Sequence, residues 1–223
     1  MKSCLFAFAL VVLSGSTAFC DEIRFYLSGD LGGSLVQGTH ATLRRAAFPG
    51  PPASSGRIEF DPGARVGFTA GYALNNYLSA EAELGGFVSP VHGGNGRDWE
   101  MHDGTLANVP LLFNLKVQYP NRSHWTPFVG GGVGVAASIL DATLLSAGAP
   151  LSSFVRADGT QADAVFAWQA FTGVAYKLGE RNEIALQYRY FVIGEPGWDS
   201  GLLGLRVGKI ETHALSVAFE HHF

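Results

Sequence analysis

The chain has 223 residues, of which 47% are hydrophobic and 15% charged, and its formal net charge is −4. The charged share lies well below the roughly 25% of soluble domains, yet no segment after residue 20 offers a helix-length apolar run, so the apolar residues must be dispersed. The negative balance excludes a broad electrostatic attraction to nucleic acid, and we expect no nucleic-acid partner.

The first twenty residues have the composition of a cleaved secretory signal peptide. Lys2 supplies the positive start, residues 5–13 form the apolar core, and residues 14–20 form a small-residue exit. A membrane anchor is the alternative, but this apolar run is shorter than the about 20 residues that cross about 30 Å of hydrocarbon. We therefore expect a signal peptide at residues 1–20.

Cleavage is expected after Cys20, with a cut after Ala18 as the second choice. Residues 21–223 then remain as one domain, which is within the usual size range. Because Cys4 and Cys20 both lie in the removed segment, the mature chain forms no disulfide.

Eight segments alternate apolar and polar residues with period two, the pattern of a half-buried strand. We predict strands at residues 23–35, 58–74, 77–88, 106–119, 125–140, 162–178, 182–192 and 207–223. The connections alternate between long ones rich in Gly, Pro, Ser and Asp, at 36–57, 89–105, 141–161 and 193–206, and short turns at 75–76, 120–124 and 179–181. This rhythm predicts an all-β fold, an eight-stranded antiparallel up-and-down transmembrane β-barrel, with loops outside the cell and turns and termini in the periplasm.

The last strand illustrates the two faces of the predicted wall. Leu215, Val217 and Phe219 share one face, whereas Ala214 and Ser216 share the other. A soluble lipocalin-like barrel would show the same alternation with the faces inverted. Here the polar faces carry mostly small residues rather than the many long charged side chains of a water-exposed surface, and small residues suit a narrow bore. Aromatic residues near strand ends form the predicted interfacial girdle, namely Tyr72, Tyr77, Tyr119, Trp125, Tyr176 and Tyr188.

Several segments together resemble the small eight-stranded outer-membrane barrels of the outer membrane protein A-like and opacity-protein kind. They are Tyr26–Gly33, Val109–Leu115, Thr126–Val135, Gln187–Tyr190 and the terminal Phe223. The resemblance implies a location in the outer membrane and a last strand that the barrel-assembly machinery recognises. The implied assembly signal is Phe219, His221 and Phe223, with His221 at a position where an aromatic residue is usual.

Charged residues on the inward faces are the candidate functional residues. They are Asp30, Arg65, Glu81, Glu83, Lys116, Lys177, Glu183, Arg189 and Glu220. Unpaired charges out of water would cost several kcal/mol each, so we expect them to pair across the bore, with hairpin geometry bringing Glu81 near Lys116 and Lys177 near Glu183. We interpret this set as a structural plug, and the alternative is a gated or selective pore.

An enzyme is the remaining class, because some barrels of this kind modify lipid A. The deacylases are expected to carry a His-x-Ser pair on one strand face, but no histidine here is followed by Ser two positions later, and no Gly-x-Ser-x-Gly occurs. Asp98, Glu100 and His102 could bind a divalent ion, but we interpret them as solvated loop polarity. We assign no catalytic residue, cofactor or metal.

The sequence therefore predicts a non-enzymatic outer-membrane β-barrel that acts in structure or surface interaction. A narrow porin or small-ligand channel is the alternative function. The expected partners are outer-membrane lipid and lipopolysaccharide, the assembly machinery, and a host or surface ligand held by the loops. We expect a monomer.

Overall fold

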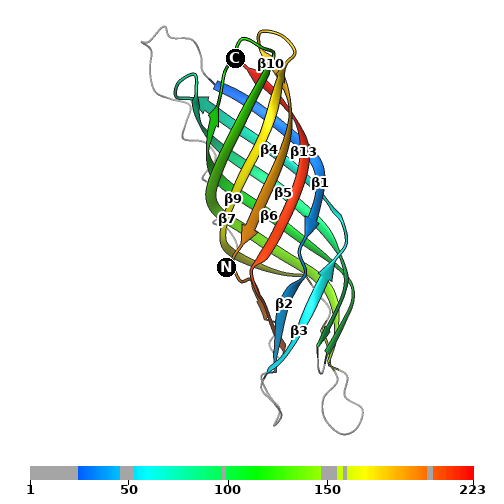
Figure 1. Cartoon of the computed structure of the whole chain (residues 1–223). Helices are drawn as coiled ribbons and strands as arrows, with labels where there is room; N and C mark the ends of the chain where they lie inside the picture. The colour runs from blue at the N-terminus through cyan, green and yellow to red at the C-terminus, as the bar shows by residue number, and fades with distance from the viewer. Residues whose placement is uncertain (1–24, 46–52, 97–98, 147–154, 158–159, 200–202) are drawn as a thin grey trace.

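The computed structural model describes residues 25–45, 53–96, 99–146, 155–157, 160–199 and 203–223, so the expected signal peptide lies outside the described residues. They form the strands β1 (Phe25–Val36), β2 (Thr39–Arg45), β3 (Ala53–Phe60), β4 (Gly63–Ala73), β5 (Leu78–Gly96), β6 (Trp99–Gln118), β7 (Trp125–Ser146), β8 (Val155–Ala157), β9 (Thr160–Lys177), β10 (Asn182–Ile193), β11 (Gly197–Asp199), β12 (Leu203–Val207) and β13 (Ile210–His222). The described part of the chain contains no helix with the length and apolarity to span a bilayer. In Figure 1 the β2–β3 hairpin extends from one end of the molecule and the C-terminus lies at the other.

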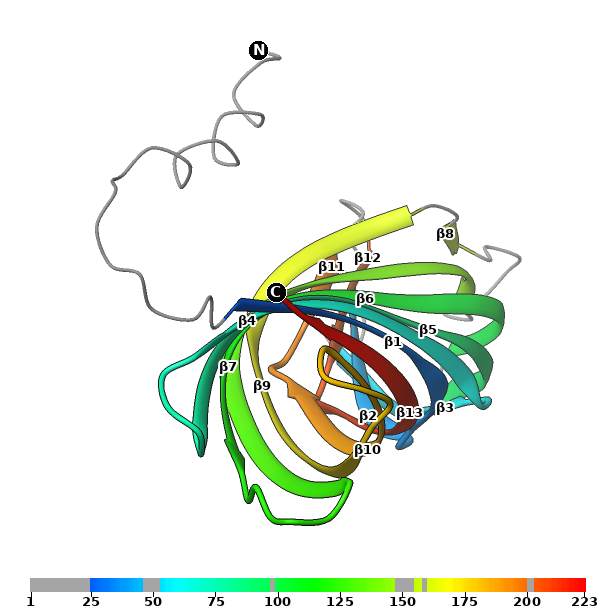
Figure 2. The same ribbon diagram turned by 90° about the horizontal axis from the view of Figure 1, so that it is seen from above.

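Eight of the strands close into a barrel. Around the ring each strand is antiparallel to its neighbours, in the order β1, β4, β5, β6, β7, β9, β10 and β13. The first and last strands join through a continuous register from Tyr26 opposite His222 to Val36 opposite Thr212. Figure 2 shows these strands encircling the barrel axis. The predicted eight-stranded antiparallel barrel is confirmed.

The three short connections lie where the sequence predicts them, and short polar side chains stabilise two of them. In the β4–β5 turn the Asn75 side-chain oxygen accepts hydrogen bonds from the amides of Tyr77 and Leu78, at 2.8 and 2.9 Å. In the β6–β7 turn Asn121 accepts a bond from the amide of Ser123 at 2.7 Å. Asparagine suits these positions because its side chain replaces a backbone partner in a tight turn.

The long connections differ from the prediction, because most of their described residues are strands rather than irregular loops. β5, β6, β7 and β9 run on past the predicted strand ends, and β2, β3, β11 and β12 lie wholly or largely in predicted loops. β3 pairs with the outer end of β5, β2 pairs with β3, and β12 pairs with both β2 and β11. This pairing satisfies backbone N–H and C=O groups that a loop would leave to water. We call this part of the molecule the extension. It consists of β2, β3, β11 and β12 together with the outer ends of β5, β6, β7 and β9, and on β5 it begins after residue 90.

Two predicted strands are each divided in two. The predicted strand at 58–74 breaks at Asp61 and Pro62, between β3 and β4, because proline has no N–H to donate to a ladder. The predicted strand at 207–223 breaks at Gly208, whose amide donates to the carbonyl of His40 at 2.8 Å, and β13 then begins at Ile210.

The outer surface of the ring is apolar, as the alternation predicts. Leu31, Phe68 and Phe113 point outward and are 69%, 65% and 66% exposed. Near the short turns the exposed side chains include the aromatic Tyr77, Tyr119 and Trp125, and the rings of Trp125 and Tyr176 lie 4.7 Å apart. An apolar band with aromatic residues at its edge is the surface that lipid requires.

The interior changes its chemistry along the barrel. On β5 the inward residues near the turns are Ser79, Glu81 and Glu83, whereas farther along the same strand the large inward residues are Phe87 and Val91, with Ser89 between them. The apolar half continues into the extension as one cluster of buried side chains, which we call the apolar cap. It includes Leu43, Ile58, Met101, Leu106, Leu140, Phe191, Ile193, Trp198, Leu205 and Ile210.

A charge placed on the outer wall should destabilise the barrel. Leu115 is 56% exposed in the middle of the apolar band, so Leu115→Arg should cost up to about 2 to 4 kcal/mol of folding free energy in lipid. The measurement is equilibrium unfolding in lipid vesicles. Ser55→Arg, on an exposed position of β3 outside that band, is the control and should change the free energy little. Equal losses in the two variants would contradict the assignment of the wall.

Candidate functional site

Inward positions on all eight strands of the ring place polar side chains in the half of the bore nearest the turns. The bore has room for them because several facing inward positions are glycines. A Cβ atom on Gly67 would overlap the carboxylate of Asp30, and one on Gly71 would overlap the ring of Tyr26. A Cβ on Gly132 would likewise overlap the side-chain oxygen of Asn114. The glycines therefore permit the close approach of the polar groups.

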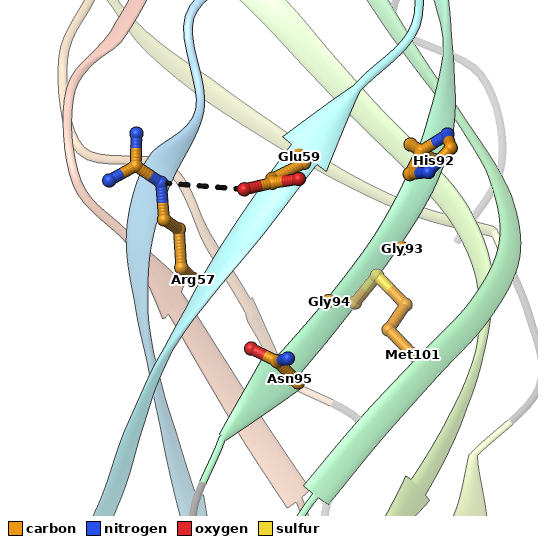
Figure 3. Close-up of a pocket in the computed structure, with 7 residues that line it drawn as sticks. All are labelled: Arg57, Glu59, His92, Gly93, Gly94, Asn95 and Met101. Carbon is orange, nitrogen blue, oxygen red and sulfur yellow. Dashed lines mark ion pairs between the residues drawn. The ribbon is translucent and has the colours of Figure 1, made fainter.

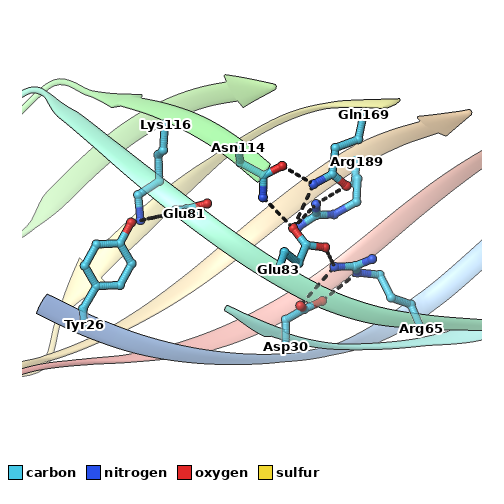
Figure 4. A network of polar contacts seen from close by, with 9 residues as sticks. All are labelled: Tyr26, Asp30, Arg65, Glu81, Glu83, Asn114, Lys116, Gln169 and Arg189. Carbon is cyan, nitrogen blue, oxygen red and sulfur yellow. Dashed lines mark hydrogen bonds and ion pairs between the residues drawn. The ribbon is translucent and has the colours of Figure 1, made fainter. Parts of the chain in front are cut away.

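Glu83 is the centre of one cluster, drawn in Figure 4. Its carboxylate accepts hydrogen bonds from Arg65 and Arg189, both at 2.8 Å, and from the side-chain amides of Asn114 at 2.9 Å and Gln169 at 2.8 Å. Glu83 is 1% exposed. Four donors on one buried carboxylate are what a charge out of water requires.

The two arginines have further partners. Arg65 donates through Nε and Nη2 to the two oxygens of Asp30, at 2.7 and 3.1 Å, which is a bidentate pair. Its guanidinium also lies 4.8 Å from the centre of the Phe87 ring. Arg189 contacts the side-chain oxygen of Gln169 and lies 5.0 Å from the centre of the Phe171 ring. With Asp30, Arg65, Asn114, Gln169 and Arg189, Glu83 forms what we call the Glu83 network, in which two acidic and two basic groups balance.

A second group, the mouth cluster, lies nearer the turns. Lys116 forms ion pairs with Glu81 at 3.1 Å and with Glu220 at 3.0 Å. The Tyr26 hydroxyl donates to Glu81 at 2.6 Å, and its ring lies 4.4 Å from the Lys116 ammonium. The other oxygen of Glu220 lies 3.0 Å from Nε2 of His222. The mouth cluster comprises these five residues and Glu183, the cross-strand partner of Glu220.

The structure thus brings together seven of the nine predicted interior charges through ion pairs. The expected contact between Glu81 and Lys116 is present, and Glu81 shares that lysine with Glu220. Lys177 and Glu183 are opposite each other on β9 and β10, but Lys177 is exposed, and the contacts of the described residues include no ion pair between them.

Sequence reasoning missed Tyr26, His222 and the two buried amides, Asn114 and Gln169, as members of the site. Asn114 and Gln169 are both at inward positions, so an amide in an inward register was the available signal. The sequence carried no comparable signal for Tyr26, because the contact of its ring with the Lys116 ammonium depends on the pairing of β1 with β13 that closes the barrel.

The residues of the expected assembly signal lie along the end of β13. Phe219 and Phe223 are 50% and 51% exposed on the outer wall. The His221 ring is hydrogen-bonded through Nδ1 to Asn182 at 2.8 Å and meets the Phe223 ring edge-on at 5.0 Å. Recognition by the assembly machinery stays a prediction.

The polar half of the bore is almost full. A cavity of about 30 Å³ remains among its residues, between Lys116, Phe128 and Glu220 among others, and it can hold two or three water molecules. Beyond it the apolar cap closes the bore, and the rings of Phe87 and Phe191 stack there at 4.7 Å with an angle of 7° between their planes. Trp198 adds a hydrogen bond from its indole to the carbonyl of Ser138 at 3.2 Å.

A shallow polar pocket of about 360 Å³ lies on the outside of the extension (Figure 3). Arg57 and Glu59 of β3 approach to 4.0 Å on one side, and His92 and Asn95 of β5 stand on the other. Between them Gly93 and Gly94 leave the strand bare, and the buried Met101 lines the floor. The candidate ion ligands Asp98, Glu100 and His102 have side chains outside the described part of the chain.

Comparison with known proteins gives a consistent result for the fold. Residues 6–223 match the family model described as outer membrane protein beta-barrel domain. Among solved structures the chain is similar to Neisserial surface protein A, with 16% identity over 90% of this chain and 97% of that chain and a TM-score of 0.51. It is also similar to the outer membrane protein OprG from Pseudomonas aeruginosa, with 14% identity over 89% and 96% of the two chains and a TM-score of 0.54. The chain matches no curated protein sequence.

Removing the central charge of the Glu83 network should destabilise the barrel. Glu83→Gln keeps the size of the side chain but leaves Arg65 and Arg189 with one carboxylate between them, and breaking a buried pair in this way costs about 3 to 5 kcal/mol. Urea unfolding in detergent micelles measures the loss. Glu59→Gln, at a side chain that is 65% exposed, should stay within about 0.5 kcal/mol of the wild type. A loss at Glu83 no larger than at Glu59 would show that the network does not stabilise the fold.

Proposed function

Because the chain belongs to the outer membrane protein beta-barrel domain family and lies in the bacterial outer membrane, we propose that it is a non-enzymatic barrel with a closed bore, acting in structure or surface interaction. The membrane ring anchors the chain, and the extension carries its strands beyond the lipid. The proposed surface for partners is the outside of the extension. We further propose that the protein acts as a monomer.

The observation that carries this proposal is the filled bore. Side chains close it twice, first through the Glu83 network and then through the apolar cap, whose members include Leu106 and Ile193 at 1% and 0% exposure. A solute passing along the axis would have to break the ion pairs of Arg65 and Arg189 and then part packed apolar side chains. A protein that only supports the extension passes no solute, so its ion pairs and its apolar packing can both stay intact.

The alternatives receive less support. A narrow porin or small-ligand channel needs a continuous path, whereas the polar half leaves only about 30 Å³. A lipid A deacylase would be expected to show a His-x-Ser pair, which the sequence lacks.

The pocket in Figure 3 supports a role in surface contact. It lies on the same strand as Val88, which is 49% exposed at the edge of the apolar band, and His92 stands four residues farther out. Arg57 and His92 could donate hydrogen bonds to phosphate or sugar oxygens at that height, and Glu59 and Asn95 could accept them from sugar hydroxyls. Lipopolysaccharide is therefore the proposed neighbour of this face.

The closed bore predicts little electrical conductance. The purified protein, inserted in a planar bilayer, should show no large stable steps because side chains block the axis. A porin of known conductance, inserted under the same conditions, is the positive control. Large stable single-channel steps from the unmodified protein would exclude the closed bore and favour the channel.

The orientation predicts which end of the barrel a reagent reaches from outside. Glu59→Cys in the extension and Glu180→Cys in the β9–β10 turn would be treated in intact cells with a maleimide coupled to a polymer too large to enter the periplasm. We expect labelling of the first variant alone, and labelling of both once the outer membrane is opened. Labelling of the turn variant in intact cells would invert the proposed orientation.

A further inference from the structure

The mouth cluster carries more negative than positive charge. Its carboxylates are Glu81, Glu183 and Glu220, and its ammonium is Lys116, so with these groups ionised and His222 neutral the balance is −2, or −1 when Lys177 is counted. Lys177, opposite Glu183, is exposed and holds none of these groups in an ion pair among the described contacts. The Glu83 network, one step deeper, is balanced by contrast. The excess at the mouth calls for a cation.

The excess charge coincides with a suitable set of donor atoms. Glu183 and Glu220 are direct cross-strand partners on β10 and β13, and His222 follows two residues later on the same inward face. One donor atom from each of the three residues lies within 4.8 Å of the others. The backbone register fixes this grouping, so it does not depend on a loop.

Two further contacts orient the donors. Lys116 occupies one oxygen of Glu220, which leaves the other oxygen facing Nε2 of His222 at 3.0 Å. The Tyr26 ring lies 5.2 Å from the His222 ring and supports it from the side. Nε2 of His222 is enclosed, and its partner among the described residues is this oxygen of Glu220. Such outer contacts are typical of ligands held ready for a metal ion.

We propose that Glu183, Glu220 and His222 form a binding site for a divalent transition-metal ion, with Zn²⁺ the best match. One imidazole nitrogen and two carboxylate oxygens are a common zinc donor set, and a water molecule from the adjacent small cavity supplies a fourth ligand. At metal–ligand distances of about 2.0 to 2.2 Å, tetrahedral donors are about 3.3 Å apart. Since the donor atoms lie within 4.8 Å of one another, the side chains need to close by at most about 1.5 Å. A bound ion would link β10 to β13 at the mouth of the barrel.

Calorimetric titration of Zn²⁺ into the full mature chain tests the site. The protein would be folded in detergent micelles, free of affinity tag and treated with chelator beforehand. We expect one ion per chain, and at least tenfold weaker binding in both Glu183→Gln and His222→Gln. Mg²⁺ is the probe for simple charge attraction and should bind far more weakly, since it disfavours imidazole.

His221→Gln is the matched control, because His221 is the adjacent residue but is bonded to Asn182 on the outer side. It should bind Zn²⁺ as the wild type does. The mobility of unheated samples on gels checks that each variant is folded, and Glu183→Gln carries the test if His222→Gln does not fold. The proposal is overturned if the wild type binds no Zn²⁺, if Glu183→Gln binds as tightly as the wild type, if His221→Gln weakens binding equally, or if Mg²⁺ binds as well. These results do not depend on whether the bore conducts.

Discussion

Closure of the sheet is the constraint on which the other features depend. Inside a bilayer no water can satisfy an open strand edge, so each strand of the ring must have a partner on both sides. The pairing of β1 with β13 and of β5 with β6 meets this requirement. A ring of eight strands encloses an interior just wide enough for side chains. Whatever points inward must therefore pack or pair, and the filled bore follows from the same closure that makes the wall stable in lipid.

The polar half shows how charges are accommodated in so narrow a space. Glu83 is held between two arginines and two amides, and glycines such as Gly67 and Gly132 remove the Cβ atoms that would collide with this network. Replacing a buried ion pair with apolar side chains is often neutral or stabilising in energy, so the charges are not required for stability as such. Once they are present, however, their mutual pairing makes each one necessary to the others.

The extension continues the same strands, but in it the apolar side chains face inward and the polar side chains face outward. On β5 the outward residue Leu84 faces lipid while the inward Glu83 is paired, but farther along Val91 is inward and buried while His92 is outward and exposed. The side-chain alternation runs unbroken as far as His92, where the register against β3 shifts by one residue, and the apolar face has by then changed from outside to inside. The protein is thus a membrane barrel whose strands continue into an extension with a buried apolar interior.

The sequence by itself determined the barrel, the number of strands in the ring, the lipid-facing residues such as Leu215 and Phe219, and the inward charges, because period-two alternation fixes which face each residue takes. It did not predict the strands of the extension. The prediction assumed that apolar side chains face outward, and this holds only for the part of the wall that faces lipid and not for the part that faces water. Apart from the pair of Glu81 and Lys116, only the tertiary structure decided which charges meet, because partners such as Lys116 and Glu220 lie 104 residues apart and come together across the bore through the closure of the ring. It also decided that Glu183, Glu220 and His222 lie close together in the mouth cluster, because their proximity depends on the register of β10 against β13.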